Sequence, residues 1–378
     1  MAKKQDDFDI LEAIADEFDG VTVGVKDDVR DWIDTGNYAM NRIISGDYFK
    51  GYPTGKIVEL YGEHSTGKSA LVYSAIGQFQ KRYGKSAVVF LDDTEDSYDP
   101  FVGRALGMNV DRLPAPETSS ITVEDHFRDL FEGTGKKKKN RWGKEEESKE
   151  PVRSGKIPFV LAKKPDAKIM IVLDSMAMLS TDHEQETGIS TDDMTKAKKI
   201  RAGMRTHWHT IAHNNILYLV TNHVGADIKQ GPVFGNPKTV PGGRAIPFLA
   251  STRLELTYPK KIEQGASITG VTIHVEVKKN KVAVPFGKCE VDIIFNQPID
   301  RLSGVVELLL RDEILKVGRR ENKKGYVLPS GRFIAEDDMK EKFTEEVFLS
   351  LFDKLPEGDS EPEAKEDNKG VGHGEQDK

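Results

Sequence analysis

One segment of the sequence has the residue types and the spacing of a phosphate-binding loop. It matches the pattern GxxxxGK[ST], is followed by Ala70, and reads Gly62-Glu63-His64-Ser65-Thr66-Gly67-Lys68-Ser69. An apolar run at 57–61 precedes it and a helical pattern follows it, which is the setting in which the pattern carries meaning. Its glycines let backbone N–H groups turn toward phosphate oxygens at a helix N-terminus, where the helix dipole favours anions. We therefore predict that residues 62–70 bind ATP, with Lys68 beside the β- and γ-phosphates and Ser69 on Mg²⁺. A glycine-rich turn without a ligand is the alternative.

Acidic residues follow two other apolar runs. Asp174 comes directly after the run at 169–173, where a carboxylate at the carboxyl end of a neighbouring parallel strand would hold the hydration shell of Mg²⁺. The run at 87–91 leads into four acids within five residues, Asp92, Asp93, Glu95 and Asp96. One of these is expected to polarise the water that attacks the phosphate, and carboxylates that cap a turn are the alternative. The residue pattern alone does not choose among them.

The elements that must position these residues alternate between strand and helix. Four short apolar runs are each followed by a polar or glycine-rich stretch and then a helical pattern; they lie at 57–61, 87–91, 169–173 and 216–221. This order predicts an α/β fold with a mostly parallel sheet and helices on both faces. Beyond residue 250 the apolar runs are longer. The runs at 251–258 and 268–277, the second of which alternates, predict an antiparallel extension of the sheet.

Shorter helical patterns lie at both ends of the chain. Near the N-terminus, Ile10, Leu11, Ile14 and Phe18 share one helix face. In the C-terminal part, amphipathic helices are expected at 302–315 and 337–354, on either side of a glycine-rich basic turn at 318–331. These residues are predicted to form a small appendage.

Charge is divided unevenly along the 378 residues, whose formal net charge of −7 comes from 55 Lys plus Arg and 62 Asp plus Glu. The segment 133–158 has nine basic and four acidic residues, whereas 356–378 has eight acidic and three basic residues. Both are expected to be disordered, because dense charge with few apolar residues cannot offset the entropy of ordering a chain. The overall charge argues against a uniformly basic protein that coats nucleic acid, but not against local DNA-binding surfaces.

Cysteine content and hydropathy limit the compartment. Cys289 is the only cysteine, which excludes an internal disulfide and a cysteine-based zinc site and indicates a reducing compartment. No apolar run approaches the roughly 18 residues of a spanning helix, and the first residues lack the apolar region of a signal peptide. A soluble, cytoplasmic protein is expected.

Four segments, in this order along the chain, resemble the RecA-type homologous recombinases, a family that includes the phage UvsX group. They lie at 54–62, 95–100, 234–243 and 277–281. The first resembles the family's entry into the phosphate-binding loop, and the second the segment that holds its catalytic glutamate. The third is similar to its second DNA-binding loop, and the fourth to a Lys-x-Lys that crosses to the next subunit. Four ordered matches, spread over about 34–295, are more specific than a phosphate-binding loop alone.

The resemblance implies roles for individual residues. Glu95 would be the general base for ATP hydrolysis, and Asp99 a nucleotide contact. Lys279 and Lys281 would reach the ATP of the neighbouring subunit and stabilise the phosphoryl group during transfer. His223 stands where UvsX has His and RecA has Gln, and it would sense the γ-phosphate. The expected catalytic set is Lys68, Glu95, His223, Lys279 and Lys281, with Ser69 and Asp174 as metal ligands.

Basic residues support DNA binding apart from the resemblance. Five of them crowd the start of a helical pattern, Lys196, Lys198, Lys199, Arg201 and Arg205. Lys229, Lys238 and Arg244 lie in a loop rich in Gly and Pro, where main-chain N–H groups can approach phosphates. A merely solvated helix face is the alternative reading of the helical group. Together with the resemblance, these patterns predict DNA contacts at Met194, Lys198, Lys199, Arg205, Lys229, Phe234, Gly242, Gly243 and Arg244.

The chain also departs from RecA in three places. Val102, beside Phe101, stands where RecA has the aromatic residue that stacks on adenine. The charged segment 133–158 has no counterpart in RecA. After residue 301 the chain is shorter than the C-terminal domain of RecA.

The expected organisation is an N-terminal oligomerisation segment (1–33), a RecA-like ATPase core (34–300) containing the charged insertion, a small C-terminal region (301–355) and an acidic tail (356–378). The expected function is a DNA-dependent ATPase that forms ATP-bound filaments on single-stranded DNA and catalyses homologous pairing and strand exchange in recombination and repair. Its partners would be single-stranded and homologous duplex DNA, further copies of the chain, and mediator and single-strand-binding proteins, in a bacterial cell or a phage-infected host. A hexameric helicase with the RecA fold, and a regulatory P-loop ATPase that does not bind DNA, remain as alternatives.

Overall fold

The computed structural model describes most of the chain between residues 29 and 354. The described residues are 29–114, 120–133, 138–139, 145–146, 153–188, 195–226, 238–239 and 245–354. The predicted N-terminal helix at 10–18, most of the charged insertion and the acidic tail lie outside them. The chain divides into two compact units between Leu308 and Leu309.

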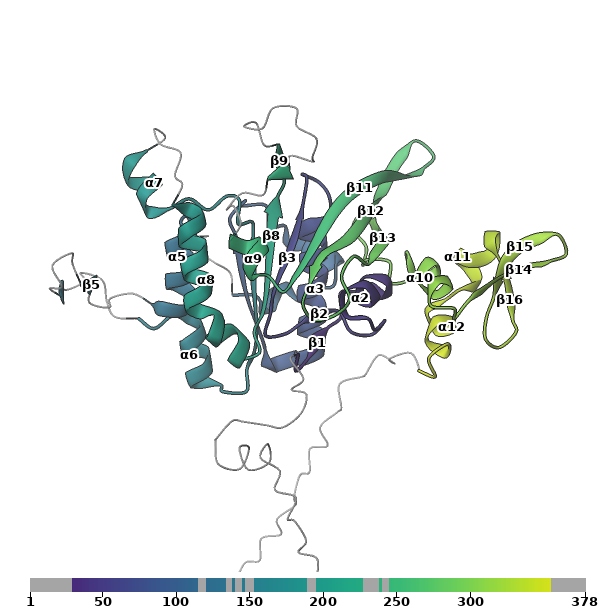
Figure 1. Cartoon of the computed structure of the whole chain (residues 1–378), viewed down its shortest axis with the longest axis horizontal. Helices are drawn as coiled ribbons and strands as arrows, with labels where there is room; N and C mark the ends of the chain where they lie inside the picture. The colour runs from purple at the N-terminus through teal and green to yellow at the C-terminus, as the bar shows by residue number, and fades with distance from the viewer. Residues whose placement is uncertain are drawn as a thin grey trace, which may run out of the picture. The chain divides into compact units, whose positions relative to one another are not determined.

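A seven-stranded sheet forms the centre of the first unit (Figure 1). Its strands, in spatial order, are β13 (Lys288–Ile294), β12 (Ser267–Asn280), β11 (Thr252–Gln264), β3 (Ile57–Gly62), β8 (Leu217–His223), β7 (Lys168–Asp174) and β4 (Ala87–Asp93). From β11 to β4 every neighbouring pair is parallel, whereas β12 pairs antiparallel with both β11 and β13. The predicted mostly parallel sheet with an antiparallel extension is confirmed.

Helices cover both faces of this sheet. On one face lie α5 (Val123–Phe127), which continues into a π-helical turn (Arg128–Glu132), α6 (Lys156–Lys163) and α8 (Lys196–His213) (Figure 1). On the other face α3 (Lys68–Tyr83) packs against β3, β4, β7 and β8. The shorter helices of this unit are α2 (Tyr38–Ser45), α4 (Pro100–Ala105), α7 (Asp182–Thr187) and α9 (Ala245–Leu249).

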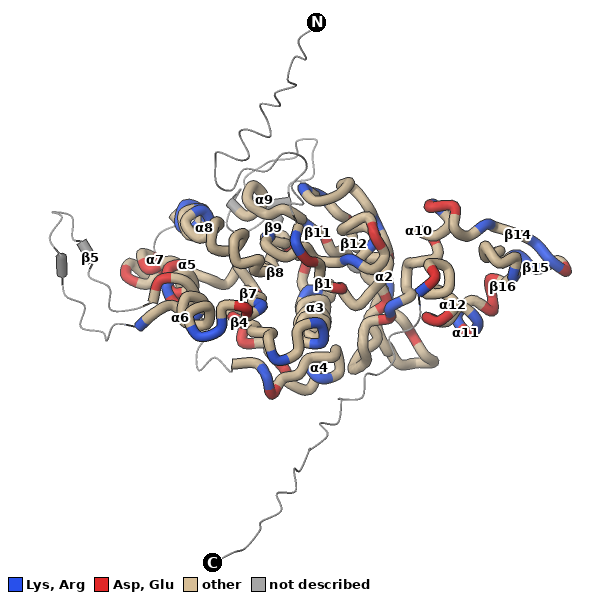
Figure 2. The backbone as a smooth tube through the Cα atoms, turned by 90° about the horizontal axis from the view of Figure 1, so that it is seen from below, with Lys and Arg blue, Asp and Glu red and all other residues tan. Residues whose placement is uncertain are grey.

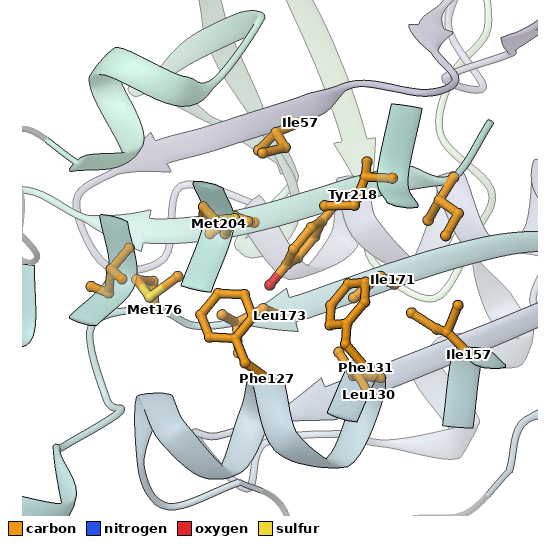
Figure 3. Close-up of a cluster of buried hydrophobic side chains, with 14 of the residues drawn as sticks. Ile57, Phe127, Leu130, Phe131, Ile157, Ile171, Leu173, Met176, Met204 and Tyr218 are labelled. Atoms are coloured by element: carbon orange, nitrogen blue, oxygen red, sulfur yellow. The ribbon is translucent and has the colours of Figure 1, made fainter. Parts of the chain in front are cut away.

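The apolar core between the helices and the sheet accounts for the short apolar runs of the sequence. Residues 169–173 of β7 are all buried, because a central parallel strand has helices on both sides. Side chains from α5 and α8, among them Phe127 and Met204, close over Ile171 and Tyr218 (Figure 3). Full burial of an aliphatic or Phe side chain contributes ~1.5–3 kcal/mol, so this cluster is a main source of stability for the unit.

Among the described residues of the first unit, three short antiparallel strand pairs lie outside the main sheet. They are β1 (Trp32–Ile33) with β2 (Tyr52–Pro53), β5 (Lys138–Lys139) with β6 (Glu145–Glu146), and β9 (Gly225–Ala226) with β10 (Lys238–Thr239). In the third pair, β9 begins two residues after the end of β8, and residues 227–237 separate β9 from β10 in the sequence. In the part of the chain that the structure describes, no helix has the length and apolar character needed to cross a membrane.

The second unit differs from the sequence prediction. Three antiparallel strands are present, β14 (Lys316–Arg320), β15 (Lys323–Val327) and β16 (Phe333–Ala335). The first two overlap the glycine-rich turn that was expected at 318–331, and the third follows it. Glu321 and Asn322 join the first two with φ values of 50° and 64°, the backbone of a tight hairpin turn. Basic residues and Gly318 interrupt the apolar alternation of these strands, so the sequence gives little sign of them.

The predicted helices of the C-terminal region are also shorter than expected. The first, α10, covers Val305–Arg311 rather than 302–315. The second, expected at 337–354, is broken into a 3-10 turn (Glu336–Asp338), α11 (Met339–Lys342) and α12 (Glu345–Ser350). The break falls before Thr344, whose side chain accepts a hydrogen bond from the N–H of Val347 and so starts a new helix.

Candidate active site at the ends of the parallel strands

The phosphate-binding loop joins the carboxyl end of β3 to the start of α3. Gly67, the residue before α3, has a φ of 80°, in the left-handed region that favours glycine. A Cβ atom at Gly62 would lie 2.3 Å from the carbonyl oxygen of Leu256, and one at Gly67 would lie 2.6 Å from Cδ1 of Ile293. Sterics therefore require glycine at both positions. Because Gly67 has no side chain to cap α3, the first N–H groups of the helix suit an anion.

Lys68 lies within this loop. Its ammonium group donates to the carbonyl oxygens of Gly62, at 3.2 Å, and Glu63, at 2.8 Å. Burial lowers the pKa of Lys68, and the nearby carboxylates of Glu95 and Asp174 oppose this shift. The amino group of Lys68 therefore lies within electrostatic reach of both acids.

Asp174 ends β7 beside the start of α3. Its carboxylate accepts hydrogen bonds from the hydroxyls of Thr221 and Ser69. Burial raises the pKa of Asp174, the negative charges of Glu95 and Asp93 raise it further, and these hydrogen bonds oppose the shift. A buried carboxylate among other acids is a site that a divalent cation would stabilise, and the hydroxyl and carboxylate oxygens are the ligands that Mg²⁺ prefers. The residues present thus fit a magnesium ion held by Ser69 and Asp174.

Glu95 follows the end of β4, and its side chain contacts residues at the ends of β7 and β8. Its Oε1 accepts from the hydroxyl of Ser175 at 2.6 Å and lies 2.5 Å from Nε2 of His223. Burial acts to raise the pKa of Glu95, but the hydrogen bonds from Ser175 and His223 and the charge of Lys68 hold it below its ordinary value. The imidazole of His64, from the phosphate-binding loop, stacks on that of His223 with ring centroids 4.3 Å apart. Glu95 is thus an ionised acceptor held next to the phosphate-binding loop.

The other three acids of this segment have different surroundings. Asp92 lies 2.6 Å from Nδ1 of His126, and Asp93 accepts from the backbone N–H groups of Ser97 and Tyr98 at 2.8 and 2.6 Å. Asp96 is exposed, with a φ of 51°. Asp93 is therefore a carboxylate that caps a turn, which was the alternative to a role in polarising water. Glu95 is the acid of the four that contacts His223.

Asp99 lies next to the site as a helix cap. Its side chain accepts from the N–H of Phe101 at 2.7 Å and so begins α4. Its nucleotide contact stays a prediction. Val102 is half-buried in α4, whereas the ring of Phe101 is 66% exposed and is the larger apolar surface at this position.

The structure places the two predicted trans-acting lysines at the far end of β12. The ammonium of Lys279 donates to the carbonyl oxygens of Pro247 and Phe248 in α9, at 2.7 and 2.8 Å, rather than to the phosphate-binding loop of its own chain. Burial lowers the pKa of Lys279 to about 8, and the positive charges of Lys281 and Arg253 contribute to the shift. A cluster of positive charge of this kind would be stabilised by an anion from outside the chain.

Sequence reasoning missed a buried ion pair that links these lysines to His223. Glu59 is fully buried in β3, forms a hydrogen-bonded ion pair with Arg253, and accepts from Nδ2 of Asn222 at 3.2 Å. Asn222 directly precedes His223 in β8. A glutamate inside the apolar run 57–61 is the signal that would have pointed to a buried partner. Ser175 was missed as well, although it directly follows Asp174.

The described part of the predicted DNA-binding surface is the start of α8. Lys198, Arg201 and Arg205 are exposed at i, i+3 and i+7, which places them on one side of the helix. Figure 2 shows basic residues, in blue, along α8. Lys199 forms an ion pair with Glu124 at 2.8 Å, and Lys196 donates to the carbonyl of Ala177 at 2.8 Å. The remaining predicted contacts lie outside the described residues: Met194, Lys229, Phe234, Gly242, Gly243 and Arg244.

The chain is similar to proteins of one family. A family model described as the RecA N-terminal domain matches residues 20–123 and 160–300. "Protein RecA" of Staphylococcus epidermidis is 30% identical over 328 residues, which cover 84% of this chain and 82% of that protein. "Protein RecA" of Francisella philomiragia is 31% identical over 299 residues, 78% of this chain and 72% of that protein. "Protein RecA" of Mycoplasmopsis pulmonis is 30% identical over 334 residues, 86% and 85% of the two chains.

Lys279 should react with amine-acylating reagents at a lower pH than an ordinary lysine. Its pKa of about 8 leaves a large unprotonated, nucleophilic fraction near that pH. We expect the labelling rate of Lys279, followed by mass spectrometry, to reach half its maximum near pH 8. Lys281→Ala removes one neighbouring positive charge and should move this midpoint to higher pH. A midpoint above pH 10 in the unaltered chain would contradict the environment described for Lys279.

Proposed function

The chain belongs to the RecA family, and on that premise we propose how its residues bind ATP, hydrolyse it and contact DNA. It is a RecA-type recombinase, a DNA-dependent ATPase that uses ATP and Mg²⁺, binds single-stranded DNA and assembles with further copies of itself. The observation that carries the proposal is the meeting of Lys68, Asp174, Glu95 and His223 at one edge of the sheet.

The phosphates of ATP would lie in the loop from Gly62 to Ser69. The N–H groups at the start of α3 would donate hydrogen bonds to the phosphate oxygens, with Lys68 leaving its two carbonyl partners to reach the β- and γ-phosphates. Ser69 and Asp174 would hold Mg²⁺, which when bound neutralises charge on the phosphate oxygens. The pKa of Asp174, raised by burial and by neighbouring acids, would fall on binding the cation.

Glu95 would act as the base. Its carboxylate takes a proton from water while the water oxygen bonds to the γ-phosphorus, and the bond from that phosphorus to the β–γ bridging oxygen breaks, leaving ADP and phosphate. Because its pKa is below the ordinary value, Glu95 is ionised at neutral pH and ready to accept this proton. His223, bonded to Glu95, would report the presence of the γ-phosphate to the segment after β8.

Neighbouring copies of the chain would complete each site. Lys279 would leave its carbonyl partners in α9 and, with Lys281, meet the ATP of the next copy, where their positive charge stabilises the transferring phosphoryl group. Arg253 and Glu59 connect Lys279 to the strand that holds His223. ATP would thereby close the contact between copies in a helical filament, and hydrolysis would loosen it.

Single-stranded DNA would contact α8 and the segments before α8 and after β9. Lys198, Arg201 and Arg205 supply a row of positive charge for backbone phosphates, which needs no basic protein overall. From the family we also propose that the protein captures a homologous duplex and exchanges strands with it. Mediator proteins and single-strand-binding proteins are its proposed further partners. Membership of the phage group, and with it a phage-infected host, rests on the resemblance at His223 and at residues 192–198.

Glu95→Gln should bind ATP but hydrolyse it slowly. The amide keeps the size of the side chain but cannot take a proton, so we expect the DNA-dependent kcat to fall by 10²-fold or more, in line with the loss of a general base, with stable filaments on DNA. Lys68→Ala is the matched control and should lose nucleotide binding itself, measured with a fluorescent ATP analogue. Full turnover by Glu95→Gln would mean that another acid is the base.

Ser175→Ala should change the pH dependence of hydrolysis. The hydroxyl of Ser175 helps to hold the pKa of Glu95 down, so its removal raises that pKa. The acid limb of kcat against pH should then move to higher pH. Ser97→Ala removes a hydroxyl that bonds to Asp93 in the same turn, and it should leave the limb in place. If the acid limb does not move in Ser175→Ala, the hydrogen bond from Ser175 does not control the ionisation that limits kcat at low pH.

Arg205→Ala should weaken binding to single-stranded DNA and reduce its salt dependence. Each phosphate contact on a single strand contributes about 0.7 to the slope of log K against log salt, so the slope should fall by about that amount. Lys85→Ala, an exposed lysine at the opposite edge of the sheet, should leave both unchanged. Equal effects of the two changes would argue against a DNA-binding role for α8.

Electron microscopy with ATP, Mg²⁺ and single-stranded DNA tests the assembly. A helical filament is expected. Closed rings would favour a hexameric helicase, and an unchanged monomer would favour a regulatory ATPase.

A further inference from the structure

A buried polar network lies inside the apolar core beneath the active site. Tyr218 stands in the middle of the cluster, beside Phe127 and Leu173 (Figure 3). Its hydroxyl lies 2.5 Å from Nε2 of His126, and Nδ1 of His126 lies 2.6 Å from Oδ2 of Asp92. The side chains of Tyr218 and His126 are fully buried. Three elements, β8, α5 and β4, thus meet through one imidazole.

Such a network is costly unless every member has a partner. Here both ring nitrogens of His126 have one, and the other carboxylate oxygen of Asp92 accepts from the N–H of Ser120 at 2.8 Å. Burial acts to raise the pKa of Asp92, but the hydrogen bond and charge of His126 lower it below the ordinary value. Asp92 is therefore an ionised carboxylate, and His126 is the side chain that keeps it so.

Asp92 stands at the point where β4 gives way to the catalytic segment. Successive residues of a strand face opposite sides, and Asp92 bonds to α5 while Asp93 bonds to the turn at 97–98. The next residue, Thr94, donates its N–H to the carbonyl of Asp174 at 2.7 Å and exchanges hydrogen bonds with the backbone of Ser175. Hydrogen bonds therefore hold each of the three residues directly before Glu95 in place.

The helix that presents His126 is itself anchored. Thr122 caps α5 by accepting from the N–H of Asp125 at 3.0 Å, and the N–H of Val123 donates to the carbonyl of Ser180 at 3.0 Å. Ser180 belongs to the segment that follows β7. The imidazole is thus held relative to all three strands that end in the active site: β4 before Glu95, β7 at Asp174 and β8 at His223.

We propose that His126 is a positioning residue for Glu95, acting through Asp92. It touches neither ATP nor water in this role. Its loss would leave the partly buried Asp92 without its main donor, so the end of β4 would loosen and Glu95 would spend less time hydrogen-bonded to Ser175 and His223. The proposal rests on the proposed role of Glu95 as the base.

The test compares His126→Leu with Phe127→Leu. Both changes remove a ring of the same core from the same helix, but only the first takes the donor from Asp92. At a temperature well below both unfolding transitions, His126→Leu should lower the DNA-dependent kcat at least tenfold, with the KM for ATP changed less than threefold. Phe127→Leu should keep kcat within twofold. Equal losses of kcat in the two variants would show that His126 only stabilises the core, and this would overturn the proposal.

Two amide substitutions separate the two hydrogen bonds. His126→Asn can place a donor near the position of Nδ1, toward Asp92, whereas His126→Gln can place one near Nε2, toward Tyr218. The Asn variant should recover part of kcat and the Gln variant should not. The reverse order would mean that Tyr218, not Asp92, transmits the effect. Should His126→Leu fail to fold, this pair alone decides the question.

A double substitution distinguishes this inference from the proposed function. If His126 acts through Glu95, adding His126→Leu to Glu95→Gln should lower the residual rate less than twofold. If the fold-decreases in kcat of the two single variants multiply in the double variant, the positioning role is refuted while Glu95 remains the base. An unchanged kcat in His126→Leu would have the same meaning. Full hydrolysis by Glu95→Gln would instead refute the proposed function.

Discussion

Parallel pairing in register is the constraint on which the active site depends. Because β3 pairs with β8, Gly62 stands level with His223, and because β4 pairs with β7, Asp93 stands level with Asp174. Residues that are far apart in the sequence thereby end at one edge, where a side chain of ordinary length such as Glu95 can join two other strands. A slip of one residue in either pair would turn every side chain of a strand to the opposite face. Such a slip of β8 would break the buried hydrogen bonds of Asn222 with Glu59 and of Tyr218 with His126.

Features that depend on neighbouring residues could be predicted from the sequence. The phosphate-binding loop, the strand-helix order and the carboxylate after the third apolar run are all set within about ten residues, and each lies where the pattern placed it. The choice among four acids is different, because it depends on partners far along the chain. His126 is 34 residues from Asp92, and His223 is 128 residues from Glu95. The resemblance to a known family supplied that choice, whereas the residue pattern did not.

The parts that could not be predicted share a physical cause. The ion pair of Glu59 with Arg253 crosses from β3 to β11, and spacing along the chain carries no sign of it. The strands of the second unit lack a regular apolar alternation, since a three-stranded sheet of this size buries few side chains. The capping threonine Thr344 divides an amphipathic pattern that would otherwise read as one helix. For the ion pair and for the broken helix, a single contact decides the structure, not the average composition of the segment.

The close approach of Gly62 to Leu256 ties the phosphate-binding loop to the antiparallel half of the sheet. A side chain at Gly62 would act as a wedge between β3 and β11, and β11 pairs with β12, which contains Lys279 and ends one residue before Lys281. On the proposal that Lys279 and Lys281 reach the ATP of the next copy, a substitution at Gly62 would disturb two nucleotide sites at once. Defects caused by mutation at Gly62 would then report on the contact between copies as well as on phosphate binding.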